Sequence, residues 1–226
     1  MTASTTTTAT SAPSKNRPRA SDRFVAYVHR LCESKGTRAE LRRGLGLPIE
    51  RCNYLHRHLV PWLSNPADDG TGDRIHPETK RAHYAVAALI AARPRTARHT
   101  PAPDAADSDT LPDWYTRPNL GAALGQAVTK GVMKPATAES TLHLMSRQTT
   151  DAIHPYLPGL IRQLLSGGIS VDWAVLLEDL AWWNRDRDKI ATRWLESYFR
   201  TTSAETEPHD TSTENPGPDT IKENAR

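Results

Sequence analysis

Only two cysteines occur in the 226 residues of this sequence, Cys32 and Cys52, and they form neither a C-x-x-C motif nor a disulfide framework. Such sparse cysteine usage fits a reducing cytoplasm. No stretch approaches the ~18 consecutive apolar residues of a membrane-spanning helix, and the N-terminus lacks the apolar segment of a secretory signal. We therefore expect a cytoplasmic protein that does not insert into a membrane.

Catalytic and cofactor motifs are missing as well. No H-E-x-x-H, G-x-S-x-G, Walker or G-x-G-x-x-G pattern occurs. His56 and His58 stand two positions apart, so they point to different sides of a helix and make a poor metal-ligand pair. The densest carboxylate pair outside the expected linkers, Glu178–Asp179, diverges by ~100° on a helix and cannot serve as acid and base together. We expect no enzyme activity, no cofactor and no metal.

Apolar residues are nearly absent from both ends of the chain. Residues 1–20 are rich in Thr, Ser, Ala and Pro, and residues 201–226 are rich in Thr, Glu, Asp and Pro. Segments of this composition bury too little apolar surface to fold, so both tails are expected to be disordered, the second one acidic. Residues 21–200 are long enough for one domain of ordinary size.

Hydrophobic spacing within residues 21–200 follows the helical period throughout, and no β alternation or Asn-Gly hairpin competes. We predict an all-α fold, a helical bundle. Helix starts are indicated by a capping box at 37–40, by prolines and by a serine cap, at Thr37, Pro48, Pro77, Pro135 and Ser170. The proline-rich stretch of about 94–118 leaves two arrangements open: one bundle, or an N-terminal lobe (about 21–93) and a C-terminal lobe (about 119–200) joined by a linker.

Positive charge is concentrated in residues 23–57, which hold eight Lys or Arg against three Glu. The stretch GTRAELRRGL (36–45) places Arg38 and Arg42 on one helical stripe, with Arg43 on its flank, and only Glu40 can neutralise them locally. Two interpretations stay open. The stripe is an ordinary solvated face, or its guanidinium groups contact phosphates.

Further cations follow in the second half of the chain. Residues 130–165 contain only two acids, and four basic residues there are candidates for phosphate contact: Lys130, Lys134, Arg147 and Arg162.

The helix predicted after Ser170 is rich in tryptophan. Its apolar stripe runs from Trp173 to Trp183, so Trp183 is expected in the core. Trp182 lies about 180° from Trp173, either under another helix or on an exposed face. Because Glu178 and Asp179 are one turn away and repel phosphate, we do not expect Trp182 to stack on nucleic-acid bases.

The order of several motifs resembles the CasB family, the small subunit of the type I-E CRISPR Cascade complex. The resemblance covers roughly residues 22–200. It rests on G-x-R-A-x-L-R-R early in the chain, then YLHRHLVPWL, LGAAL, LHLMSRQTTDAIHPYLPGLIRQLL and, last, DWAVLLEDLAWWNRD (172–186).

That resemblance implies an all-helical, non-catalytic protein that assembles, usually as two copies, within an RNA-guided complex. The implied partners are the backbone and large protein subunits, a second copy of the chain, the crRNA and the target DNA. Basic residues would hold the crRNA–target heteroduplex and the displaced strand. By motif these are Arg42 and Arg43, Arg147, Arg162, and Arg185 and Arg187 after the Trp pair. The chain departs from the family at Arg162–Gln163, where two adjacent basic residues are often found, and at PATAES (135–140), which lacks arginines.

Two other interpretations remain. A purely structural helical adaptor would bridge protein subunits, with its arginines bound to acidic partners. A helix-turn-helix repressor is less favoured, because the GLGLP turn (44–48) precedes an apolar, His-bearing segment without base-reading side chains.

Overall fold

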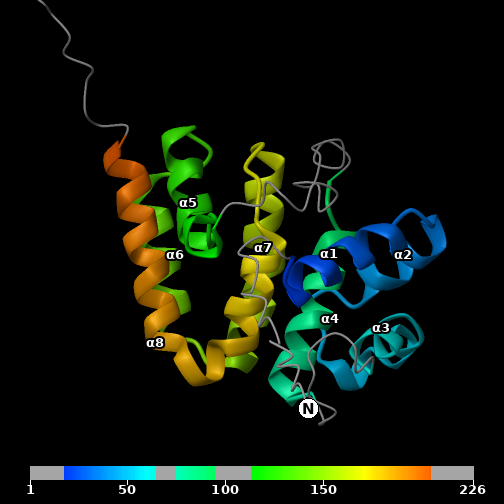
Figure 1. Cartoon of the computed structure of the whole chain (residues 1–226). Helices are drawn as coiled ribbons and strands as arrows, with labels where there is room; N and C mark the ends of the chain where they lie inside the picture. The colour runs from blue at the N-terminus through cyan, green and yellow to red at the C-terminus, as the bar shows by residue number, and fades with distance from the viewer. Residues whose placement is uncertain (1–17, 65–74, 95–112, 205–226) are drawn as a thin grey trace, which may run out of the picture.

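A computed structural model describes residues 18–64, 75–94 and 113–204, and all regular structure in these ranges is helical (Figure 1). The all-α prediction is confirmed. Most of the two expected tails and of the expected linker lies outside the described residues. Where their inner ends are described they belong to the fold, because the first helix begins at Ala20 and the last runs to Ala204.

Eight α-helices and three short 3-10 turns make up the described part of the chain. The α-helices are α1 (Ala20–Leu31), α2 (Lys35–Arg43), α3 (His56–Leu63), α4 (Pro77–Ala91), α5 (Leu120–Thr129), α6 (Pro135–Ser146), α7 (Thr150–Ser166) and α8 (Trp173–Ala204). The 3-10 turns are Ile49–Arg51, Asn53–Leu55 and Trp114–Thr116.

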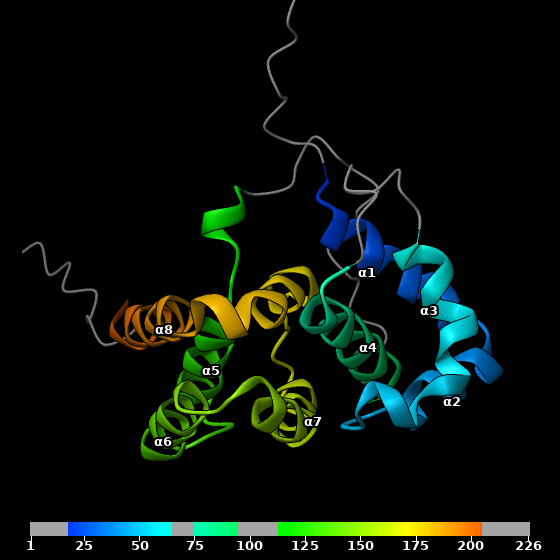
Figure 2. The same cartoon turned by 90° about the horizontal axis from the view of Figure 1, so that it is seen from below.

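The helices form two groups that pack against each other. Figure 2 shows α1 to α4 on one side and α5, α6 and α8 on the other. Helix α8 joins the groups, because α1, α4 and α5 all contact it. One cluster of buried apolar side chains extends from Leu59 in α3 to Trp194 in α8. The division into two lobes with a linker at about 94–118 stays a prediction, since residues 95–112 are outside the described ranges.

Two predicted helix starts are wrong. Helix α2 begins before Thr37, and its cap is Ser34, whose hydroxyl accepts a hydrogen bond from the Thr37 amide (3.4 Å). Helix α8 is capped by Asp172 rather than Ser170, because one Asp172 carboxylate oxygen accepts from the amides of both Ala174 and Val175 (3.1 Å each). In both places another side chain of the right kind lies two or three residues from the predicted cap.

The helix predicted to start at Pro48 is also different. Two 3-10 turns occupy residues 49–55, and α3 follows them and continues past Pro61 to Leu63. Of the four residues that helical spacing from Pro48 predicts to face inward, Cys52, Leu55 and Leu59 are buried and Ile49 is half-buried. Over so short a segment, 3-10 turns and an α-helix bury apolar residues at similar spacings.

Helix α8 bends sharply at Asp186, where the backbone leaves the helical region (φ −125°, ψ 27°) (Figure 1). The bend brings Trp183 and Trp194 together, with ring centroids 4.9 Å apart. It also lets the Asp179 carboxylate accept a hydrogen bond from the Trp194 indole (2.7 Å). These two residues are 15 positions apart, and a straight helix would separate them by ~22 Å.

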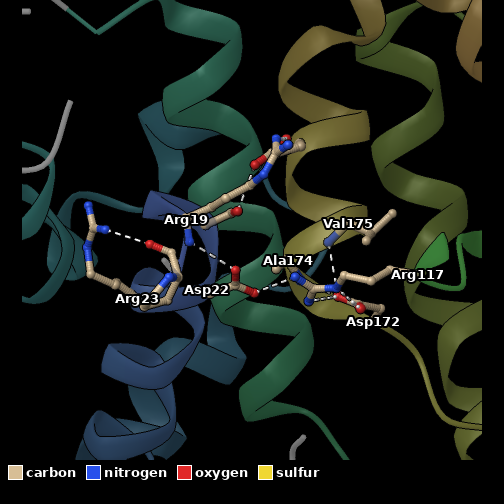
Figure 3. Close-up of polar contacts among 10 residues, drawn as sticks. Arg19, Asp22, Arg23, Arg117, Asp172, Ala174 and Val175 are labelled. Carbon is tan, nitrogen blue, oxygen red and sulfur yellow. Dashed lines mark hydrogen bonds and ion pairs between the residues drawn. The ribbon is translucent and has the colours of Figure 1, made fainter. Parts of the chain in front are cut away.

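A buried arginine in the segment predicted as linker connects α1 to α8 (Figure 3). Arg117 forms two hydrogen bonds with Asp172, both 2.7 Å, and one with Asp22 of α1, also 2.7 Å. All three side chains are less than a tenth exposed. The hydrogen bonds and charges of the two aspartates raise the pKa of Arg117 although burial opposes them. Arg117 is therefore a structural residue.

Helix α7 buries a histidine that sequence patterns do not distinguish from the others. His154 is 6% exposed, and neither ring nitrogen has a hydrogen-bond partner within the described residues. Burial, helped by the charge of Arg81 and opposed by that of Asp151, lowers the pKa of His154 to about 4. The neutral imidazole is the form that the folded protein accommodates.

Acid is therefore expected to destabilise the fold through His154. The folded-state pKa lies below the ordinary value of 6.5, so the unfolded state binds more protons between pH 6.5 and about 4. Stability falls as the pH drops through that window, and His154 alone should lower the free energy of unfolding by about 2 kcal/mol at pH 5 relative to pH 7. Urea unfolding at the two pH values measures it.

The variant His154→Leu should lose most of this pH dependence. His143→Leu, which changes an exposed histidine on α6, should keep it. Equal pH dependence in His154→Leu and the unmodified protein would contradict the assignment. A residual dependence is expected in every variant, because burial also lowers the pKa of His29 to about 4.

Candidate nucleic-acid interface

The basic face of α2 is held outward by one buried leucine. Leu41 is fully buried, which leaves Arg42 and Arg43 exposed and Arg38 half-buried. The sequence suggests Glu40 as their local counter-charge. Instead the Glu40 carboxylate is turned to α3, where Arg57 and His58 (2.7 Å) bind it, and these hydrogen bonds lower the pKa of Glu40.

The three α2 arginines consequently do not have Glu40 as a counter-charge. Among the residues that the structure describes, no carboxylate forms an ion pair with Arg38, Arg42 or Arg43. An exposed guanidinium without a protein partner is suited to bind phosphate, because its charge persists at any relevant pH. The α2 face is therefore the strongest part of the predicted site.

The second-half candidates are exposed but do not form one patch. Lys130 and Lys134 flank the turn between α5 and α6, and Arg147 follows α6. Arg162 on α7 shares a small hollow of about 210 Å³ with Leu45, just beyond the end of α2. The structure thus brings Arg162 toward the α2 arginines, whereas Lys130 and Lys134 lie at the α5–α6 turn and Arg147 at the end of α6.

Arg185 and Arg187 lie on either side of the bend in α8. The Arg187 guanidinium pairs with Asp188 (3.3 Å), and Lys189 pairs with Asp186 (2.8 Å). Arg185 instead lies over the Trp182 ring, with its guanidinium carbon 5.4 Å from the ring centroid. Of the two predicted arginines, Arg185 is the one whose charge is not balanced by a neighbouring carboxylate in the described part of the chain.

The two adjacent tryptophans have different environments, as the helical spacing predicts. Trp183 is fully buried, and its indole N–H donates to the Gln148 carbonyl (3.0 Å). Trp182 is 49% exposed. Glu178 and Asp179, which the sequence suggests would repel phosphate from Trp182, are both engaged by other residues of the fold.

Those two carboxylates are bound by residues distant in the chain. Glu178 accepts from the Ser21 hydroxyl (2.8 Å) and pairs with Arg19 (3.2 Å) at the start of α1. Asp179 is buried against Arg193 and Trp194, and burial raises the pKa of Asp179 to about 6. The sequence does not predict the Trp182–Arg185 contact, because it does not show that both acids are bound by residues distant in the chain. Its i, i+3 spacing is the signal that could have revealed it.

Neither metal ligation nor membrane insertion is supported by what the structure describes. Within residues 18–64, 75–94 and 113–204, no three His, Cys, Asp or Glu side chains gather as a metal site would require. In the same ranges none of the helices combines the length and the apolar character needed to cross a bilayer.

Comparison with known proteins gives one family. Residues 37–199 match the family described as CRISPR-associated protein Cse2. No curated protein gives a match to this chain.

Solved structures agree with the family match. A chain of a CRISPR RNA-guided surveillance complex is 35% identical, with a TM-score of 0.66 over 83% of this chain and 95% of that one. A chain of such a complex in a pre-nicking state is 34% identical, with a TM-score of 0.68 over 83% and 96%. CasB from M. ruber is 22% identical, with a TM-score of 0.61 over 82% and 96%, and shares the fold.

Proposed function

This chain belongs to the Cse2 family of CRISPR-associated proteins, and on that premise we propose that it holds nucleic acid within an RNA-guided surveillance complex without catalysing a reaction. Its basic side chains bind the phosphate backbones of the crRNA–target heteroduplex and of the displaced DNA strand. Base pairing elsewhere in the complex reads the sequence, so this contact is electrostatic and independent of sequence.

The observation that carries the proposal is that no carboxylate of the described residues pairs with Arg42 or Arg43. Both are exposed, and the carboxylate nearest to them in the chain, Glu40, is occupied by α3. Arg38 and Arg162 extend the same surface. We propose five further phosphate contacts that contribute less to binding: Lys130, Lys134, Arg147, Arg185 and Arg187.

The proposed partners follow from the relatives that are chains of surveillance complexes. They are the backbone and large protein subunits, the guide RNA, the target DNA and a second copy of this chain, all in the cytoplasm. Under the alternative of a purely structural adaptor, the α2 arginines would pair with acidic groups of a protein subunit. Crosslinking of single-stranded DNA to the reconstituted complex distinguishes the two, because adducts on α2 require nucleic-acid contact.

Removing the arginine pair tests the proposal. The variant Arg42→Ala/Arg43→Ala should fold normally, because both side chains are exposed. Retention of target DNA by the assembled complex should weaken about tenfold or more at moderate salt, and the slope of log affinity against log salt should become shallower by about two. A salt titration of target-DNA retention measures both effects.

The matched control is Arg42→Lys/Arg43→Lys. It keeps the charges, so it should retain most of the affinity and the original salt slope. If the alanine pair leaves both retention and slope unchanged, the α2 face does not bind nucleic acid and the adaptor role is favoured.

A further inference from the structure

Trp182 is a large aromatic side chain that the fold leaves half exposed beside a cation. Its exposed fraction is 49%, whereas Trp183 next to it is fully buried. Arg185, three residues later, places its guanidinium over the indole ring. Because Glu178 and Asp179 are bound by other residues, the charge next to the exposed ring is positive.

Arg185 also lines a hollow at the bend of α8. It has a volume of about 440 Å³ and is lined by both arginines of the bend and by polar side chains from the turn between α6 and α7, among them Gln148, Thr149 and Thr150. This volume lies within the range of ~300–1,000 Å³ that small-molecule sites occupy.

The hollow has a rigid wall and unused hydrogen-bonding capacity. Trp183 lines it, and its position is held by the hydrogen bond from its indole N–H to the Gln148 carbonyl. The buried Thr150 hydroxyl has no partner within the described residues. Arg187 and Lys189 are neutralised by Asp188 and Asp186, which also line the hollow, so Arg185 supplies the unbalanced charge.

We propose that Trp182 and Arg185 form a stacking site for one unpaired nucleobase, with Arg185 holding the adjoining phosphate at the mouth of the hollow. The inference rests on the proposed function and adds a base contact to its phosphate contacts. Stacking on an aromatic ring tolerates every base, so it suits a protein that binds without reading sequence. A single-stranded segment is the implied ligand, because only unpaired bases present a free face.

Paired oligonucleotides test the site on the full-length chain. The probes are a short fluorescent oligo(dT) and an abasic strand of equal length, which carries the same phosphates without bases. Trp182→Leu should weaken oligo(dT) binding about tenfold and leave abasic binding unchanged, since one stacked base is lost. Trp182→Tyr should retain most of the oligo(dT) affinity. Arg185→Gln should weaken both probes, because it removes a phosphate contact.

The outcomes separate this inference from the proposed function. If wild-type chain binds both probes with the same salt dependence and Trp182→Leu changes neither, stacking is excluded while phosphate binding stands. If wild-type chain binds neither probe at low salt, the stacking site is overturned, whereas the proposed function is decided by target-DNA retention in the assembled complex. If Trp182→Leu keeps both affinities but no longer co-purifies with the other subunits, Trp182 belongs to a protein contact and the stacking site is overturned. Far-UV circular dichroism should be unchanged in all three variants, because both positions are exposed.

Discussion

Arg117→Met is expected to lower the free energy of unfolding by about 3–5 kcal/mol, the cost of leaving buried charges without their counter-ion. Asp22 and Asp172 are both less than a tenth exposed, and Arg117 is the only cation paired with either in the described part of the chain. Methionine fills much of the space and removes the charge. Urea or thermal unfolding of the full-length chain measures the loss.

The charge itself can be separated from the packing. In Asp22→Asn/Arg117→Met/Asp172→Asn none of the three charges remains. The asparagine oxygens can still accept hydrogen bonds from the backbone amides that the aspartates bind, which are those of Arg19, Ala174 and Val175. This triple variant should recover a large part of the lost stability. Arg147→Met changes an exposed arginine and should have little effect. A loss as small for Arg117→Met as for Arg147→Met would contradict the role assigned to the cluster.

Gly121→Ala is expected to destabilise the protein by about 2–3 kcal/mol, although alanine is the better helix former by about 1 kcal/mol. A methyl group at this position of α5 would overlap the backbone carbonyl of Trp194 and lie 2.7 Å from its Cα. A backbone cannot turn aside as a side chain can, so α5 and α8 would have to separate. The midpoint of urea unfolding should fall accordingly.

Gly159→Ala makes the same substitution where the added methyl group meets nothing within 4 Å. This variant should be stabilised by up to about 1 kcal/mol, because only the difference in helix propensity remains. A loss of stability at Gly121 and a gain at Gly159 would show that the effect at Gly121 comes from the contact between α5 and α8. Stabilisation by Gly121→Ala would contradict the close approach.

Much of the local structure follows from the sequence because its causes are local. The spacing of apolar residues predicts the helices and the buried position of Trp183. Pro77 and Pro135 mark the starts of α4 and α6, and the glycines of α5 indicate a close neighbour. Caps are less certain, as Ser34 and Asp172 show, because several residues near a helix end can accept the same amide.

The candidate site is only partly predictable. The sequence alone identifies the α2 arginines as candidates, because three guanidinium groups fall on one outward face. It does not reveal that Glu40 is bound by α3, or that Glu178 and Asp179 are bound by Ser21 and Trp194. Whether a charged side chain is ion-paired depends on which helix packs against its own.

The sequence by itself thus determined the all-α class, most of the helices apart from their ends, and the residues of the basic α2 face, since each depends on neighbours within a few positions. Tertiary structure alone decided which charges are neutralised. Arg117 meets Asp22 across 95 positions and Asp172 across 55, so its side chain is buried between the starts of α1 and α8. Those pairings depend on where helices cross and bend, and helical periodicity carries no information about that.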